Sequence, residues 1–199
     1  MNILEFIQRV QAISKVGLLF SKDPYAIENY QELQRLSTDF LNREFDLDVV
    51  DNIFTRDIYP TVNVSCRTVV FNDKQQVLMV KEMDEQLYSF PGGWCDIGVS
   101  PQENAKREVF EESGIVCEIE SLVAVFFRDL YKKSNPNLIS EYVIYFKAKA
   151  IGGSLNPNHE IEEAGFYDLN QLPPLSFKNS PEEVTRVLAA IKNNSNDYD

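Results

Sequence analysis

Acidic residues gather at helical spacing in the middle of the chain. Glu108, Glu111 and Glu112 stand three and four residues apart, so on an α-helix their carboxylates would lie within one arc of about 100°. Like charges at this spacing repel one another, and the last two would sit where the helix dipole is already negative. Because carboxylate oxygens on a rigid helix suit Mg²⁺ or Mn²⁺, the spacing predicts a site for a hard divalent cation.

The residues around this acidic run predict where the helix begins and ends. Ser100 is placed as the N-cap, Pro101 as the first helical residue and Glu103 as the partner that closes a capping box, while Gly114 is a stop signal. Arg107 flanks the acidic arc and offsets part of its repulsion. The alternative interpretation is a solvated acidic helix without a ligand.

The whole stretch resembles the Nudix box. It reads as Gly93, five residues, Val99, seven residues and then the run REVFEESGI from Arg107 to Ile115. The family's signature has the same residue types at its named positions, except that a Glu stands where this chain has Val99. The resemblance implies an α/β fold, namely an α/β/α sandwich with a mixed sheet over residues 61–192. It also implies an enzyme that hydrolyses a phosphoanhydride with one or more Mg²⁺ ions, with Mn²⁺ as an alternative.

The resemblance further implies roles for the acidic helix. We expect Glu108 and Glu112 to bind the metal directly, and Glu111 to bind it directly or through water. Arg107 is expected to orient a ligand glutamate by a charge-assisted hydrogen bond.

Val99 is the one departure from the family's pattern. The family Glu at that position can supply an outer ligand or a partner for the arginine of the box. In this chain another carboxylate takes that role, with Asp96 a candidate from the same loop, or the metal has fewer supporting contacts.

A general base is expected in the loop of residues 156–163, because Nudix enzymes often carry a second acidic group there. Glu160 or Glu163 is the better candidate, and a solvated surface residue is the more frequent role for the single histidine, His159.

Further residues are candidates for binding substrate. Arg67 and Lys81, on the early strands, are candidates for gripping phosphate, although lone cations on strands are more often surface charges. Gly93 belongs to the same glycine-rich loop. Tyr88 and Trp94 border this loop and are placed to stack on a base or another ring, with a core position as an equal alternative for Trp94.

Two amphipathic helices are predicted before this region. Apolar residues recur at helical spacing from Ile3 to Ile13, with Gly17 as the expected end, and a second helix begins at the cap Asp23 and runs to about Glu44. We expect a helical hairpin over residues 1–48, then a linker over residues 49–60. The hairpin is too small to bury a core alone, so it either packs on the main domain or forms a homodimer.

After residue 60 the spacing of apolar residues changes from a helical pattern to patterns typical of strands. A β-hairpin is predicted from residues 62–71 and 77–80, followed by strands at residues 87–90, 116–127, 142–150 and 165–169. Ser180 caps a final helix, and residues 193–199 are expected to form a disordered tail.

Short segments in and around the box narrow the resemblance to one subgroup of the family. GLLFSKDPYAIENYQELQRL from Gly17, VSCR from Val64, PGGWCDIG from Pro91 and LPPLS from Leu172 are similar to a bacterial Nudix subgroup of ADP-ribose or CDP-choline pyrophosphatases. The implied substrate is a nucleoside diphosphate linked to a moiety X. Two other classes stay open: a nucleotide sensor without turnover and a metal-dependent RNA exonuclease.

Composition limits the partners of this chain. With 199 residues, 44% hydrophobic content and a net charge of −12, it is globular and has little attraction for nucleic acid or an anionic membrane. Charged residues interrupt the N-terminus where a signal peptide would be apolar, and no run approaches 18 apolar residues. Its three cysteines lack paired spacing, so a reduced, cytoplasmic setting is expected.

Overall fold

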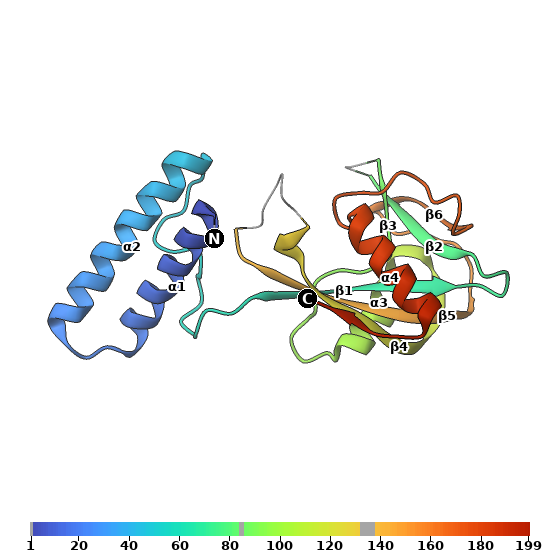
Figure 1. Cartoon of the computed structure of the whole chain (residues 1–199), viewed down its shortest axis with the longest axis horizontal. Helices are drawn as coiled ribbons and strands as arrows, with labels where there is room; N and C mark the ends of the chain where they lie inside the picture. The colour runs from blue at the N-terminus through green and yellow to red at the C-terminus, as the bar shows by residue number, and fades with distance from the viewer. Residues whose placement is uncertain (1, 84–85, 132–137) are drawn as a thin grey trace. The chain divides into compact units, whose positions relative to one another are not determined.

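The computed structural model describes residues 2–83, 86–131 and 138–199 (Figure 1). The chain forms two compact units, one up to Val62 and the other from Asn63 to Asp199. In the described part of the chain, no helix has the length and apolar character needed to cross a membrane.

The N-terminal unit is a pair of helices, α1 (Ile3–Phe20) and α2 (Pro24–Phe45), as predicted. Asp23 caps α2 by accepting a hydrogen bond from the Tyr25 amide. The prediction that Gly17 ends the first helix is wrong, because α1 continues for three more residues. Gly17 instead makes room for α2: a Cβ there would stand 2.4 Å from ring atoms of Tyr30. The glycine therefore serves close packing between the helices.

The buried side-chain amide of Gln11 on α1 links this helix to α2 and to the segment that follows α2. Gln11 is fully buried; its Nε2 donates to Ser37 Oγ at 2.6 Å and to Thr38 Oγ1 at 3.0 Å, and its Oε1 accepts from the Ile53 amide at 3.1 Å. Asn52 is also buried and donates to the Gln11 carbonyl. Residues 49–53, which the sequence predicts to begin a linker, thus pack onto the helices.

The second unit is built on a mixed, seven-stranded sheet. Its order is β3-β2-β1-β5-β4-β7, with β6 pairing to β2. The pairs β1–β5 and β4–β7 are parallel and the others antiparallel. The strands are β1 (Asn63–Phe71), β2 (Val77–Glu82), β3 (Tyr88–Ser89), β4 (Ile115–Phe127), β5 (Glu141–Gly153), β6 (Ile161–Tyr167) and β7 (Asp197–Tyr198).

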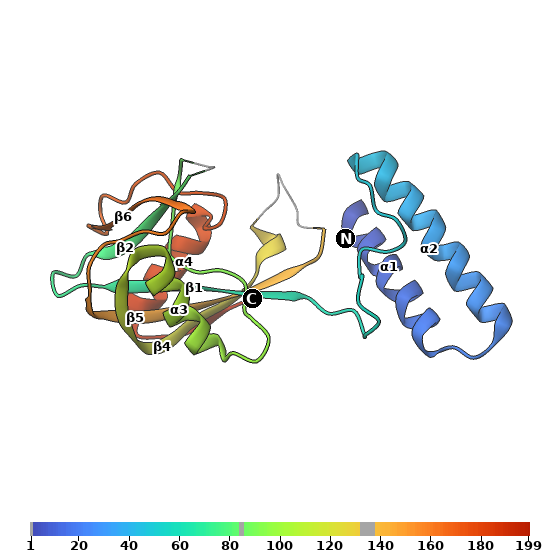
Figure 2. The same ribbon diagram turned by 180° about the vertical axis from the view of Figure 1, so that it is seen from behind.

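Helices cover both faces of this sheet. Val69 on β1 belongs to an apolar cluster with Val184 and Val187 of α4 (Pro181–Asn193), whereas its neighbour Val70 packs with Val109 of α3 (Pro101–Ser113). Side chains alternate across a strand, so α4 and α3 lie on opposite faces. The face carrying α4 is turned to the viewer in Figure 1 and the face carrying α3 in Figure 2. The predicted α/β/α sandwich is confirmed.

The ends of the elements follow local chemistry. The capping box of Ser100 and Glu103 is formed, and Gly114 ends α3 in the left-handed conformation with φ 75°. Ser180 caps α4 in the same way. The prediction of a disordered tail is wrong: β7 pairs with β4, and Arg186 binds Asp197 through two nitrogen–oxygen contacts of 2.6 and 2.8 Å. A bidentate ion pair thus orders the last residues.

We predict that Gln11→Ala destabilises the helical unit by about 1–3 kcal/mol, since it leaves the buried Ile53 amide without an acceptor. Hydrogen exchange of the α1 and α2 amides measures the effect. Gln31→Ala, at an exposed position of α2, is the matched control and should change little. Equal protection in the two variants would contradict the role given to Gln11.

Candidate active site

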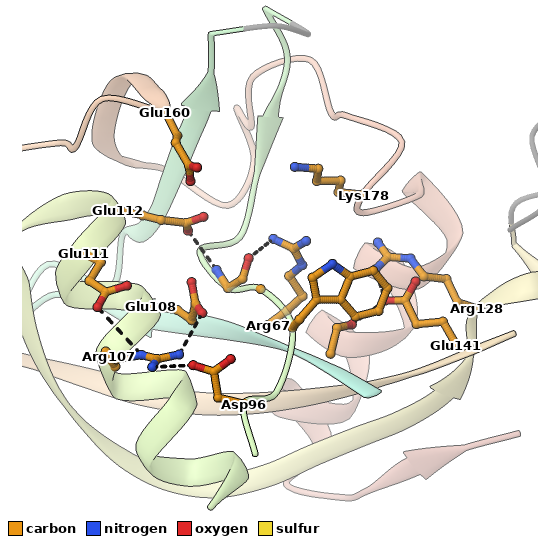
Figure 3. Close-up of a pocket in the computed structure, with 14 residues that line it drawn as sticks. Arg67, Asp96, Arg107, Glu108, Glu111, Glu112, Arg128, Glu141, Glu160 and Lys178 are labelled. Carbon is orange, nitrogen blue, oxygen red and sulfur yellow. Dashed lines mark hydrogen bonds and ion pairs between the residues drawn. The ribbon is translucent and has the colours of Figure 1, made fainter. Parts of the chain in front are cut away.

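The glycine-rich loop after β3 joins the acidic helix to the sheet. The Gly92 amide donates to Glu112 Oε2 at 2.8 Å, and the Gly92 carbonyl accepts from Arg67 Nη1 at 2.5 Å (Figure 3). A glycine is required here, because φ is 147° and a Cβ would stand 2.1 Å from the Cys66 carbonyl oxygen. The backbone of one residue therefore positions a carboxylate and a guanidinium from two different elements.

The carboxylates of α3 face this loop. A Cβ on Gly93 would stand 3.0 Å from the carboxyl atoms of Glu108, so the second glycine lets that group come close. Removal from water raises the pKa of Glu112 to about 7; the neighbouring Glu108 and Glu82 also raise it, and Arg67 opposes the shift. Burial likewise raises the pKa of Glu108. Both shifts mark carboxylates in a poorly hydrated place, because removal from water is the largest cause of each.

Arg107 is the positive partner of this face. Its Nη1 contacts Asp96 Oδ2 at 2.6 Å, its Nη2 lies 3.4 Å from Glu108 Oε1, and its Nε lies 3.7 Å from Glu111 Oε1. Asp96 therefore supplies a carboxylate partner for the arginine, which Val99, in the same loop, cannot do because its side chain is apolar. Of the two alternatives left by the sequence, the geometry supports the replacement by Asp96.

These groups line a pocket of about 470 Å³. Nine of the residues proposed from the sequence take part in its wall: Arg67, Gly93, Trp94, Asp96, Arg107, Glu108, Glu111, Glu112 and Glu160. The close-up shows Glu160 and the α3 carboxylates at one end, with Arg67 between them and Arg128 (Figure 3). The pocket thus joins an acidic end to a region with guanidinium groups.

Three of the proposed residues do not line this pocket. Lys81 forms an ion pair with Glu162 at 3.2 Å. Tyr88 and Tyr167 each donate a hydroxyl hydrogen bond of 2.9 Å to the carboxylate of Glu163. These contacts occupy the three groups in a neighbouring network on β2, β3 and β6, which leaves Glu160 as the loop glutamate that reaches the pocket.

His159 contributes to an adjoining cavity of about 410 Å³. Glu112, Glu160 and Lys178 line both cavities, so the histidine lies next to the candidate site without being part of its wall.

Four pocket residues were not found by sequence reasoning: Ser65, Arg128, Glu141 and Lys178. Ser65 begins the buried part of β1, and Glu141 is the first residue of β5, while Lys178 follows the LPPLS segment. A buried position for the charged Arg128 and Glu141 is the unusual property, and no local spacing reveals it. The pairing of β5 with both β1 and β4 brings Ser65, Arg128 and Glu141 together.

The residues fit a divalent cation by their chemistry. In the described ranges, no three acidic, cysteine or histidine side chains converge closely enough to hold an ion as they stand. Glu108 and Glu112 nevertheless share one pocket, and their raised pKa values mark carboxylates that a cation would stabilise. The donors are hard oxygens, the ligands that Mg²⁺ prefers.

Two family models match this chain. A family model described as the NUDIX domain matches residues 61–188, and another, described as a UDP-X-like N-terminal oligomerisation domain, matches residues 1–51. The protein YjhB of Bacillus subtilis strain 168, provisionally named an ADP-ribose pyrophosphatase, is 37% identical over 194 residues, which cover 95% of this chain and 92% of YjhB.

The following are two of the solved structures that are similar to this chain. That of a UDP-X diphosphatase is 28% identical, covers 98% of this chain and 97% of its own, and has a TM-score of 0.65. That of an ADP-ribose pyrophosphatase from Streptococcus suis 89-1591 is 30% identical, covers 70% of this chain and 100% of its own, and has a TM-score of 0.60. Since the family model spans most of the sheet unit and YjhB is similar over nearly its whole length, the chain belongs to the Nudix family of hydrolases.

Proposed function

We propose that this chain hydrolyses the diphosphate bond of a nucleoside diphosphate linked to a moiety X, of the ADP-ribose or CDP-choline class, with Mg²⁺ as cofactor and Mn²⁺ as a substitute. The observation that carries the proposal is the pairing of two carboxylates of raised pKa, Glu108 and Glu112, with the buried guanidinium of Arg67 in one pocket. Names of relatives support the substrate class: ADP-ribose pyrophosphatase for two and UDP-X diphosphatase for another.

Metal binding is assigned to the pocket face of α3. Glu108 and Glu112 would hold the ion, and Glu111 would contribute directly or through water. A bound divalent cation supplies charge neutralisation of the diphosphate and acidifies an attacking water. Arg107, fixed by Asp96, keeps Glu108 and Glu111 in place.

The other residues bind substrate and move the proton. Arg67, held by the carbonyls of Phe90 and Gly92, presents positive charge to a phosphate oxygen. Glu160 is the general base, because it faces the pocket, whereas Glu163 is held by two tyrosines. Trp94, 56% exposed on the pocket wall, offers a stacking surface.

A nucleotide sensor is the second candidate function, since Val99 departs from the family's pattern. The Asp96–Arg107 pair weighs against it, because it restores a carboxylate partner for the arginine. A nuclease is disfavoured by the net charge of −12. Phosphate release from a panel of nucleoside diphosphate conjugates, measured with Mg²⁺ and after phosphatase treatment, tests the enzyme; end-labelled RNA tests the nuclease.

We further propose that the N-terminal unit forms a homodimer. Its surface exposes large apolar side chains, among them Ile13 and Phe20, which line an open hollow of about 430 Å³ within that unit. An exposed apolar surface of this kind is a frequent contact surface between proteins. The family description of residues 1–51 as an oligomerisation domain supports the proposal.

We expect Glu112→Gln to keep the fold and abolish turnover. The side-chain oxygen of the glutamine can still accept the hydrogen bond from the Gly92 backbone amide. Because loss of the charge also removes the repulsion between this side chain and the neighbouring carboxylates, the melting temperature should be equal or higher. Turnover should fall by more than the roughly 10- to 100-fold typical of losing an outer contact. Glu118→Gln, exposed on β4, is the control. Near-parental turnover at saturating Mg²⁺ would show that the metal assignment is wrong.

The second expectation concerns the partner of Arg107. Asp96→Asn should raise the Mg²⁺ concentration for half-maximal activity by roughly 10- to 100-fold, and Val99→Glu on that background should recover part of the loss. Val99→Glu alone should raise activity at most several-fold. Asp73→Asn, which breaks an exposed pair with Lys149, is the matched control. An unchanged Mg²⁺ dependence in Asp96→Asn would refute the replacement.

The third expectation concerns assembly. Ile13→Glu combined with Phe20→Glu should shift the sedimentation coefficient from dimer to monomer, because both charges would be buried in the proposed contact. Gln31→Glu, exposed on α2, adds charge elsewhere and should leave it unchanged. A wild-type chain that sediments as a monomer would end the proposal.

A further inference from the structure

Lys178 is a cation of the pocket wall to which the proposed function gives no role. Its ammonium forms an ion pair with a carboxylate oxygen of Glu82, the last residue of β2. The lysine side chain is 41% exposed, so the pair leaves the ammonium accessible to a ligand. Lys178 lines both the pocket and the adjoining cavity of about 410 Å³, and the close-up shows its ammonium directed toward Glu112 and Glu160 (Figure 3). It therefore stands where the two cavities meet.

The backbone around Lys178 is fixed to the same strand end that holds Arg67. Ser176 is buried, and its hydroxyl accepts from the Lys178 amide at 3.0 Å. Asn179 is also buried, and its Oδ1 accepts from the Phe90 amide at 2.8 Å. The Phe90 carbonyl in turn accepts from Arg67 Nη1 at 3.2 Å. Short contacts through one residue thus place the base of the lysine side chain relative to the guanidinium.

Acidic groups share the adjoining cavity with this ammonium. The cavity is lined by three carboxylates, those of Glu82, Glu112 and Glu160. In the described part of its wall Lys178 is the only lysine or arginine, and the sequence adds Asp84 and Glu85 shortly after β2, outside the described residues. A phosphate at this place therefore depends on Lys178 and on a bound divalent cation for positive charge.

A lysine at this point can change partners. Its ammonium sits on a flexible four-carbon stem and has three rotatable donors, whereas two carbonyls hold the Arg67 guanidinium in one place. Phosphate oxygens and the Glu82 carboxylate are acceptors of the same kind, and both form charge-assisted hydrogen bonds with an ammonium. The ammonium therefore keeps an anionic partner when it turns from Glu82 to a phosphate.

We propose that Lys178 binds the phosphate on the X side of the diphosphate, while Arg67 binds the phosphate on the nucleoside side. Trp94, the stacking surface offered to a nucleobase, lines the pocket that holds Arg67, so the nucleoside half belongs there. The X half then extends past Lys178 into the adjoining cavity. On binding, the ammonium exchanges the Glu82 carboxylate for a phosphate oxygen. The inference rests on the proposed function for the class of substrate and for the metal.

Binding of an analogue that cannot be hydrolysed tests this role. α,β-Methylene-ADP carries both phosphates, whereas AMP lacks the one assigned to Lys178. In calorimetry on the full chain with saturating Mg²⁺, we expect Lys178→Gln to bind the analogue about 10-fold more weakly than the wild type does, the loss typical of one charge-assisted hydrogen bond. Its affinity for AMP should stay within about 2-fold. Lys178→Arg keeps the charge and should lose less than about 3-fold.

Glu82→Gln distinguishes a phosphate ligand from a structural ion pair. It breaks the same pair but removes the carboxylate that competes with phosphate for the ammonium, so the analogue should bind as tightly as to the wild type or up to about 3-fold more tightly. A pair that only held β2 to the segment of Lys178 would make both variants bind more weakly. Lys147→Gln breaks a surface pair of 2.7 Å with Glu120, and as the matched control it should change neither affinity.

Turnover separates this role from the proposed function. With ADP-ribose as substrate, Lys178→Gln should raise KM about 10-fold and leave kcat within about 2-fold, because the contact is made before and during the reaction. Absence of turnover with the binding pattern intact would refute the proposed function only. Turnover with a KM that Lys178→Gln leaves unchanged would refute the role of Lys178 only.

Four binding results would also overturn the role of Lys178. They are an unchanged affinity of Lys178→Gln for the analogue, an equal loss for the analogue and AMP, weaker binding of the analogue to Glu82→Gln, and a wild type that binds the analogue no more tightly than AMP. If Lys178→Gln does not fold, the last two comparisons decide.

Discussion

The hydrogen bond from the Gly92 amide to Glu112 is the contact on which the site depends. It holds the last turn of α3 against the sheet. The carbonyl oxygen of Gly92 in turn accepts a hydrogen bond from Arg67. A side chain at this position would collide with the Cys66 carbonyl, so the strand and the loop approach as closely as backbones allow. The carboxylate and the guanidinium are thus placed by backbone, which moves less than side chains do.

The closeness of these groups has an electrostatic cost. Glu108 and Glu112 are partly removed from water and repel one another, and the whole chain carries a net charge of −12. Arg107 forms ion pairs with Asp96, Glu108 and Glu111, which reduce the repulsion among these carboxylates. It forms no such pair with Glu112 in the described part of the chain. In the proposed function, a divalent cation held by Glu108 and Glu112 would offset this charge and that of a bound diphosphate. The arrangement therefore favours a ligand that brings positive charge with it.

The sequence alone determined the features that depend on neighbours within about one helical turn. Ser100, Glu103 and Gly114 set the ends of α3, because capping bonds join residues that are adjacent along the chain. The 3.6-residue period likewise placed three glutamates on one face. The same local chemistry identified Asp23 as the cap of α2. The prediction for Gly17 was wrong, because a glycine that ends a helix and one that makes room for a neighbouring ring cannot be told apart from the sequence.

Only the tertiary structure decided which distant residues share the pocket. The choice of Glu160 over Glu163 depends on two tyrosines from separate strands, and the Arg128–Glu141 pair depends on where β4 and β5 meet. The tail is ordered for the same reason, because its partner Arg186 lies on α4 and is not implied by the tail's own composition. Sheet register and helix packing bring together residues tens of positions apart, and no periodicity in the chain encodes those distances.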